Sequence, residues 1–240
     1  SGGSVLCKCI ASMQRTIVIS EVHPDQLING FNPYDPLQLL LAQTSLGENS
    51  SLRHQIFLKR IIDTDTILRN NNLNTVLRDH THSDYLNQNS IDQINNTASL
   101  IEVVNKHFEI CSVLSLRNPL HSYSSLIHNN WNNAIKSFED YCSRVLLMLQ
   151  TYEELGALII KYEDFCINPD LVLKQICEKL MLDFSPNYAE NFYNIPMSGD
   201  SGRAAGIKTI KQLKPRKVDQ SILEEAASSK SFMQISSHSA

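Results

Sequence analysis

The chain has 240 residues, of which 42% are hydrophobic and 19% are charged, and its formal net charge is −4. This composition predicts one globular domain, residues 1–240, with a sizeable core. The negative charge argues against binding to a nucleic-acid backbone, and no apolar run is long enough to span a membrane.

The six cysteines do not follow a zinc pattern, because Cys7-Lys8-Cys9 lacks a second ligand pair. Cys111, Cys142 and Cys177 fall inside apolar patterns and are expected to be buried thiols. No signal peptide is recognisable at the start of the sequence. Together these features predict a reducing, cytoplasmic setting.

The sequence opens with Ser1-Gly2-Gly3-Ser4, followed by apolar residues at near-helical spacing up to Met13. A Gly-Gly step before a Ser cap can let backbone N–H groups converge on an anion. A linker or a frayed terminus would have the same composition. The full G-x-x-x-x-G-K-[ST] pattern is absent, so an ordinary nucleoside-triphosphatase loop is not supported.

Two apolar, β-favouring segments follow, each with a helical pattern beside it. Residues 15–22 (R-T-I-V-I-S-E-V) and residues 75–78 (T-V-L-R) predict buried strands. Residues 51–70 predict the helix between them, and residues 90–107 predict a helix after the second strand.

A polar stretch, D-H-T-H-S-D-Y, follows the second strand at residues 79–85. Two histidines and two carboxylates at the carboxyl end of a strand are placed for acid–base chemistry. His80 and His82 would share one face of an extended segment, so metal ligation is considered, although no third His or Cys ligand is obvious nearby. A polar surface loop is the remaining alternative.

The next strand ends at an arginine. Residues 110–116 are short and apolar, Arg117 follows them, and Pro119 cannot continue a strand ladder. Three serines then open a helical pattern: Ser122, Ser124 and Ser125. Free N–H groups and the helix dipole favour negative charge at such a position, and a guanidinium grips phosphate. The segment predicts an anion site, with an ordinary capped turn as the alternative.

A further helical face starts at Trp131, because apolar residues recur every three or four positions from there to Leu149. We therefore expect this single tryptophan to pack in the core. Residues 158–162 predict a fourth strand, and Asn168-Pro169 predicts the cap and first turn of the next helix.

The segment from 197 to 215 holds three glycines and Arg203, a composition that lets backbone amides close on a phosphate. A surface loop without a role is the alternative. The order of strands and helices, with ligand-type residues at strand ends, predicts a three-layer α/β/α domain with a mainly parallel central sheet.

Arg117-Asn118-Pro119, with Ser125 eight positions after the arginine, resembles the 3′-phosphate-binding motif of sulfotransferases that use 3′-phosphoadenosine 5′-phosphosulfate (PAPS). The resemblance implies a P-loop nucleotide-binding type of fold, in which Arg117 and Ser125 hold the 3′-phosphate. Tyr162, in a segment similar to the family's Y-E-D-L…N-P element, is implied to contact the adenine. Arg203, with Lys208 as a further hypothesis, is implied to close on the 3′-phosphate.

Two other segments are also similar to the family. Residues 1–6 resemble its 5′-phosphosulfate loop, so Ser1, Gly2, Gly3 and Ser4 are implied to cradle that group. The family also has a basic residue and a strand ahead of this loop, which the sequence does not contain. Arg78-Asp79-His80 resembles the strand end that carries the family's catalytic histidine, with His82 as the second choice for the base.

The resemblance implies transfer of a sulfuryl group from PAPS to a hydroxyl or amine of a small-molecule or carbohydrate acceptor, without a metal. Two alternatives stay open. One is a P-loop kinase-like phosphotransferase, which needs a Walker lysine and a Mg²⁺ carboxylate that the sequence does not show. The other is a catalytically silent nucleotide-binding protein of the same fold.

Overall fold

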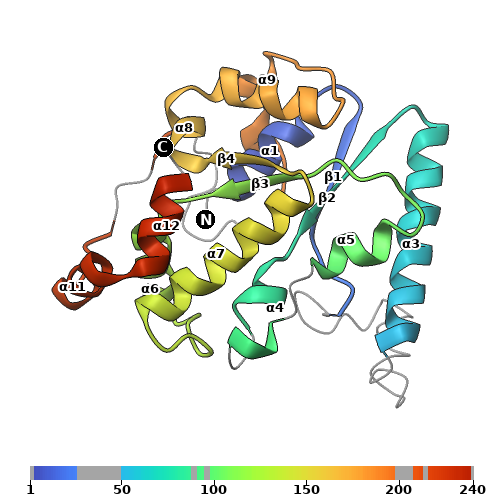
Figure 1. Ribbon diagram of the computed structural model, residues 1–240. Helices are drawn as coiled ribbons and strands as arrows, with labels where there is room; N and C mark the ends of the chain where they lie inside the picture. The colour runs from blue at the N-terminus through green and yellow to red at the C-terminus, as the bar shows by residue number, and fades with distance from the viewer. Residues whose placement is uncertain are drawn as a thin grey trace.

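The computed structural model describes residues 3–25, 50–87, 91–94, 98–197, 208–212 and 216–238. Within these ranges the chain alternates between short strands and helices, and the fold is mixed α/β (Figure 1). No helix of the described ranges is long and apolar enough to cross a membrane.

The first sheet consists of β1 (Thr16–Val22) and β2 (Asn74–Asp79), which pair in parallel. The chain enters β1 from α1 (Gly3–Ala11) and crosses between the strands through α3 (Ser50–Asn70). These elements confirm the strands and helices predicted for the first third of the sequence. The pairing register shifts between Ile19 and Val22, so β1 carries an irregularity near its carboxyl end.

The second sheet consists of β3 (Val113–Leu116) and β4 (Leu158–Lys161), also parallel. The connection between them runs through α6 (Pro119–His128) and α7 (Phe138–Glu154). Among the described residues no strand pairs β2 with β3, so the sheets remain separate ladders.

α6 begins earlier than the three serines that were expected to open it. Asn118 is its cap and accepts a hydrogen bond from the backbone N–H of Leu120 (3.0 Å), and Pro119 occupies the first turn. Asn168 and Pro169 begin α9 (Pro169–Lys179) in the same way, as predicted.

Short helices connect the remaining parts of the fold. They are α4 (His82–Tyr85), η2 (Ile91–Gln93), α5 (Ser99–Val104), α8 (Tyr162–Ile167), α10 (Tyr188–Asn191) and η3 (Phe192–Asn194). The one long helix predicted for residues 90–107 is therefore wrong, since η2 and α5 are separate.

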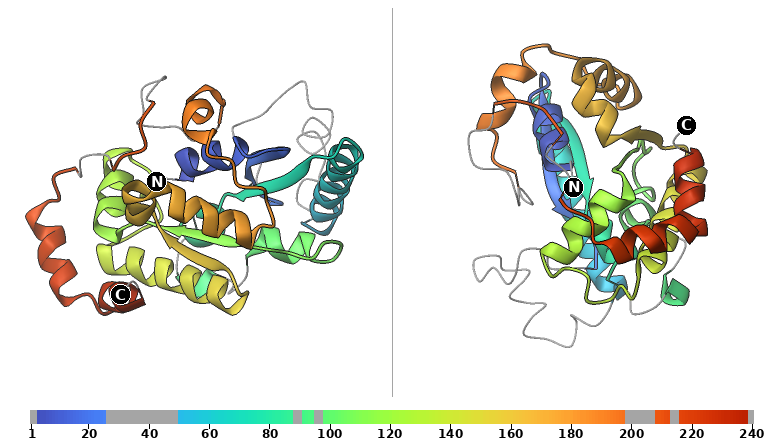
Figure 2. Two further views of the ribbon diagram at one scale, coloured as in Figure 1. Left: turned by 90° about the horizontal axis from the view of Figure 1, so that it is seen from above. Right: turned by 90° about the vertical axis from the view of Figure 1, so that its left-hand side faces the viewer.

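The C-terminal helices α11 (Gln220–Ser228) and α12 (Lys230–His238) lie at the opposite end of the molecule from α3 (Figure 2). Glu139 at the start of α7 attaches these helices to α7, because its carboxylate accepts hydrogen bonds from the hydroxyls of Ser229 and Ser231. The polar contact thus joins two segments that are about 90 residues apart in sequence.

Two groups of buried side chains form the core. One surrounds α7, where Phe138 and Leu149 are fully buried, and the other joins α1 to α9 through Cys9 and Leu173. Each strand carries side chains into one or both groups, so the cores hold the strand ends in place.

Three expectations about burial are wrong. Trp131 lies outside any helix and is 54% exposed, so it is not a core residue. Cys111 is half-buried, although Cys142 and Cys177 are buried as predicted. Most residues of β1 and β2 are half-buried, whereas strands of a parallel sheet are usually buried on both faces.

Candidate functional site

The carboxyl ends of β2 and β3 border a single cavity of about 1390 Å³. Six residues predicted for the site line it: Gly3, Arg78, His80, His82, Arg117 and Ser125. Ser4 and Tyr162 are buried and do not line it. Ser1, Gly2 and Arg203 lie outside the described residues.

The same cavity extends along the two strands, and every residue of β2 and of β3 borders it. Side chains of a strand alternate between its faces, so a cavity that touches every residue lies along the hydrogen-bonding edge. The edge of β2 that is not paired with β1 and the edge of β3 that is not paired with β4 therefore face this cavity.

Arg117 stands at the end of β3, and no ion pair joins it to another of the described residues. Its guanidinium carbon lies 5.6 Å from the centre of the Tyr162 ring, a cation–π contact. Its Nε is buried and has no hydrogen-bond partner among the described residues. A cationic donor left unsatisfied beside a cavity favours an anionic ligand, because unpaired buried polar groups are costly.

The two segments that carried the strongest resemblance meet at this corner. Tyr162 packs against Arg117, and Glu163 accepts a hydrogen bond from the backbone N–H of Asn118 at 3.1 Å. The start of α8 therefore fixes the turn between β3 and α6. Ser122 and Ser125 on α6 border the cavity beside the arginine.

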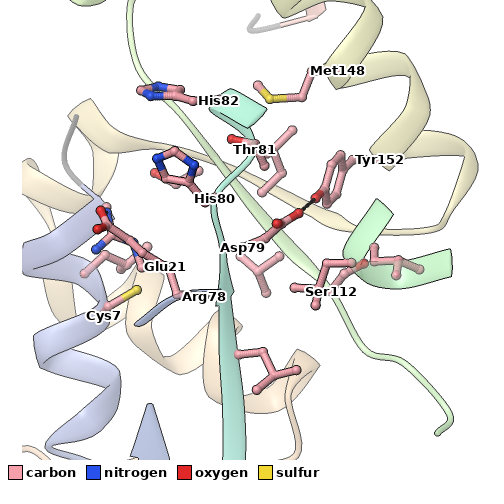
Figure 3. Close-up of a pocket in the computed structure, with 18 of the residues that line it drawn as sticks. Cys7, Glu21, Arg78, Asp79, His80, Thr81, His82, Ser112, Met148 and Tyr152 are labelled. Carbon is pink, nitrogen blue, oxygen red and sulfur yellow. Dashed lines mark hydrogen bonds and ion pairs between the residues drawn. The ribbon is translucent and has the colours of Figure 1, made fainter. Parts of the chain in front are cut away.

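Arg78, at the end of β2, is paired in contrast to Arg117. Its Nη2 lies 3.4 Å from Glu21 Oε1, and its Nη1 donates to Ser20 Oγ at 3.1 Å (Figure 3). Gly3 permits the guanidinium to approach α1, because a Cβ on Gly3 would lie 3.3 Å from Nη2. Cys7 lies on α1 near this guanidinium, and burial raises the pKa of its thiol to about 11.

Glu21 is a cavity residue that the sequence reasoning missed. Its φ is 55°, in the left-handed region that a glutamate rarely adopts, and it falls within the irregular part of β1. Backbone strain of this kind is concentrated at functional sites. A single carboxylate in an otherwise apolar strand was the only local signal.

His80 follows β2 and is held by two contacts. Its backbone N–H donates to Val22 O at 3.2 Å, and its Nδ1 lies 2.8 Å from Ser83 Oγ. Burial lowers the pKa of the imidazole below 6.5, and the neighbouring charge of Arg78 acts in the same direction. The ring is therefore neutral at pH 7, and no hydrogen bond of the described residues engages its Nε2.

His82 begins α4, and its ring packs edge-on against His80 with centroids 5.5 Å apart. Burial lowers its pKa to about 4, and the neighbouring His80 contributes in the same direction. Both histidines are thus uncharged at neutral pH, so protonation alone does not distinguish them as bases.

Asp79 and Tyr152 form a second feature that the sequence did not indicate. The Tyr152 hydroxyl donates to Asp79 Oδ2 at 2.7 Å, while Oδ1 is buried without a hydrogen-bond partner among the described residues. Burial raises the pKa of Asp79 to about 6. The pair ties the end of β2 to α7 directly beside His80 (Figure 3).

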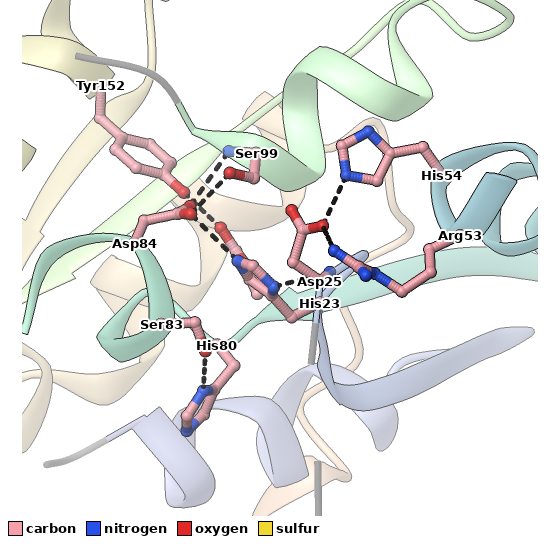
Figure 4. A network of polar contacts seen from close by, with 10 residues as sticks. His23, Asp25, Arg53, His54, His80, Ser83, Asp84, Ser99 and Tyr152 are labelled. Carbon is pink, nitrogen blue, oxygen red and sulfur yellow. Dashed lines mark hydrogen bonds and ion pairs between the residues drawn. The ribbon is translucent and has the colours of Figure 1, made fainter. Parts of the chain in front are cut away.

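A polar network next to the segment that carries His80 stabilises the end of β1 (Figure 4). His23 Nε2 lies 3.1 Å from Asp84 Oδ1, and Asp84 also accepts hydrogen bonds from the backbone and hydroxyl of Ser99. Burial opposes protonation of His23, but the Asp84 carboxylate outweighs it and raises the pKa. The network joins β1, α4 and α5.

Within the described ranges, no three His, Cys, Asp or Glu side chains gather in a way that could hold a metal ion. His80 and His82 therefore have no third ligand there. Comparison with protein-family models, with curated proteins and with solved structures gives no match for this chain.

Proposed function

We propose that this protein is a sulfotransferase that moves a sulfuryl group from PAPS to a hydroxyl or amine. The observation that carries the proposal is the Arg117 guanidinium, whose buried Nε has no hydrogen-bond partner among the described residues and which borders the same cavity as the neutral imidazole of His80. An anion receptor and a neutral base that share one space are the two parts that such a transfer needs.

In this proposal Arg117 and Ser125 bind the 3′-phosphate, and Arg203 completes that site. The fork of the arginine suits two phosphate oxygens, and its contact with Tyr162 restrains its orientation. Tyr162 itself is buried and does not line the cavity, so its part is to hold the arginine.

In this proposal Gly2 and Gly3 receive the 5′-phosphosulfate at the start of α1, because Gly3 lines the cavity and the buried Ser4 does not. Arg78 lies against Gly3 and is neutralised in part by Glu21. A partly neutralised guanidinium can align the transferring group and donate to its oxygens without holding the product too tightly.

His80 acts as the base, with His82 as the second candidate. Its Nε2 accepts the acceptor proton while Ser83 holds Nδ1, so the ring is oriented for transfer. General-base help of this kind is worth about 100- to 10,000-fold in rate. The pKa of the imidazole, lowered by burial, keeps it unprotonated at neutral pH.

We also propose that the fold is the three-layer P-loop type. Two parallel strand pairs, whose β2 and β3 edges border one cavity in the described part of the chain, support this proposal. Six unbridged cysteines support a reducing, cytoplasmic location.

Titration calorimetry with adenosine 3′,5′-bisphosphate, 5′-AMP and ATP–Mg²⁺ tests the proposal. We expect the bisphosphate to bind at least about 10-fold more tightly than 5′-AMP, because only the former offers a 3′-phosphate to Arg117. Equal affinities would remove the 3′-phosphate site, and preferred binding of ATP–Mg²⁺ would favour a kinase. Sulfated products, detected by mass spectrometry with PAPS, separate an enzyme from a silent binding protein.

A further inference from the structure

Trp131, the only tryptophan of the chain, is 54% exposed and borders the cavity. Its position follows from how α6 ends. Asn130 has a φ of 56°, its N–H donates to Ile127 O (2.9 Å), and the N–H of Trp131 donates to Leu126 O (3.0 Å). This is a Schellman ending, in which Asn130 takes the left-handed position.

In such an ending the residue at the place of Trp131 usually packs back onto the helix. Trp131 remains more than half exposed instead, at the border of a cavity. An exposed indole in that position presents a flat apolar face and one N–H donor to whatever enters the cavity.

Arg144 joins the segment that follows Trp131 to the helix that His82 begins. This arginine is fully buried on α7 and donates to Tyr85 O at 3.1 Å and to Ala134 O at 3.4 Å. Its Nε donates to Asp140 at 2.8 Å. Because Tyr85 ends α4, which starts at His82, the loop after α6 and the histidine-bearing segment are clamped to the same helix.

Trp131 shares the lining of the cavity with five uncharged residues, which come from the two segments that Arg144 joins and from α7: Asn87, Asn129, Asn130, Asn133 and Met148. We call these six residues the Trp lobe. Four of them are amides that can both donate and accept hydrogen bonds. The nearest charged residue of the clamp, Arg144, is engaged by Asp140 and two carbonyl groups.

This chemistry selects among acceptors. A phenol would stack on the indole but would offer one hydroxyl to four amides. A charged peptide would find no opposite charge among the side chains of the lobe. A pyranose ring offers several hydroxyls around its rim and an apolar face of C–H groups, which fits amides around an indole.

We propose that the acceptor is a neutral carbohydrate, with one pyranose ring stacked on Trp131 and a hydroxyl directed to His80. The proposal rests on the sulfotransferase function. The hydroxyl oxygen forms a bond to sulfur, and the bond from sulfur to the bridging phosphate oxygen breaks. The electron pair leaves with adenosine 3′,5′-bisphosphate, and His80 Nε2 takes the hydroxyl proton.

Because Trp131 is the single tryptophan, its fluorescence reports on the lobe without any need for catalysis. The probes are lactose, cellotetraose, maltotetraose and N,N′-diacetylchitobiose, with 2-naphthol and a tyrosine peptide as rivals. We expect a saturable change in emission with at least one saccharide and none with the peptide. Naphthol alone changing the emission, or no saccharide doing so, overturns the carbohydrate assignment.

Two variants give a readout in turnover with PAPS and the saccharide that binds. Trp131→Ala should raise KM for the saccharide by about 10-fold with a much smaller change in kcat, and Trp131→Phe should recover part of the loss. Met233→Ala, which shortens an exposed side chain on the remote α12, is the matched control. A Trp131→Ala enzyme with unchanged KM contradicts the proposal.

The outcomes also separate this inference from the function on which it rests. Binding of the bisphosphate without any saccharide response overturns only the carbohydrate acceptor. A saccharide response without bisphosphate binding overturns the sulfotransferase function and supports the lobe as a carbohydrate site.

Discussion

The two strand ends that border the cavity each carry an arginine, but the two arginines have different interaction partners. At the end of β2, Arg78 is paired with Glu21 and Ser20 and lies against the start of α1. At the end of β3, Arg117 has an aromatic ring beside it and an unsatisfied Nε. The end of β2 is therefore nearly neutral and already arranged for the reaction. The end of β3 has a positive charge that can bind an anion.

The largest effect is expected at the reaction end. His80→Ala should lower turnover by about 100- to 10,000-fold, since it removes the proposed base, and should leave bisphosphate affinity within about twofold. His82→Ala is the matched control from the same segment. If His80→Ala retains turnover and His82→Ala does not, the two bases must be exchanged.

The second prediction concerns the acid at the same strand end. The pKa of Asp79 is raised to about 6, above the value near 3.9 of an unfolded aspartate. The folded state therefore holds this proton more strongly, and its contribution to stability falls as the pH rises from about 4 to 6.

Asp79→Asn should remove that loss, raising the free energy of unfolding at pH 7 by up to about 3 kcal/mol and leaving little change at pH 4. Tyr152 can still donate to the amide oxygen. Urea denaturation at both pH values measures the change in the free energy of unfolding. The control is Asp63→Asn, at an exposed aspartate. Destabilisation at pH 7 would mean that the charged Asp79–Tyr152 pair is favourable.

The third prediction tests the binding end. Arg117→Ala should weaken bisphosphate binding by about 1.5–3 kcal/mol, the range for hydrogen bonds to charged groups. Arg117→Lys should recover only part of this, because an ammonium lacks the planar fork. Arg216→Ala, at an exposed position, is the calorimetric control. An unchanged dissociation constant in Arg117→Ala would exclude this arginine from the 3′-phosphate site.

Many of the strands, helix starts and strand-end residues described above could be predicted from the local sequence. The four described strands follow from short β-branched and apolar runs, and α9 begins at Asn168-Pro169 as expected. Arg117 and His80 each follow a strand of a parallel pair, and both border one cavity, as expected for ligand-type residues at strand ends.

The remaining parts depend on contacts that a local pattern does not contain. The pairing of Asp79 with Tyr152 spans 73 residues. Glu21 reaches the cavity because its backbone turns into the left-handed region. Trp131 fits the apolar spacing of α7, but Asn130 ends the preceding helix in a left-handed conformation and α7 starts only at Phe138.

The smallest effect should appear in the free energy of unfolding, which should fall more when Arg78 is removed than when Arg117 is removed. Arg78→Ala leaves the Glu21 carboxylate, whose side chain is 13% exposed, without its cation and should cost about 1–2 kcal/mol. Arg117→Ala removes a buried unsatisfied donor and should cost less than about 0.5 kcal/mol. Adding Glu21→Gln to Arg78→Ala should restore part of the loss, a coupling that a double-mutant cycle measures. Equal losses for the two arginines would show that Arg117 is compensated in the folded protein, and the contrast between the strand ends would no longer hold.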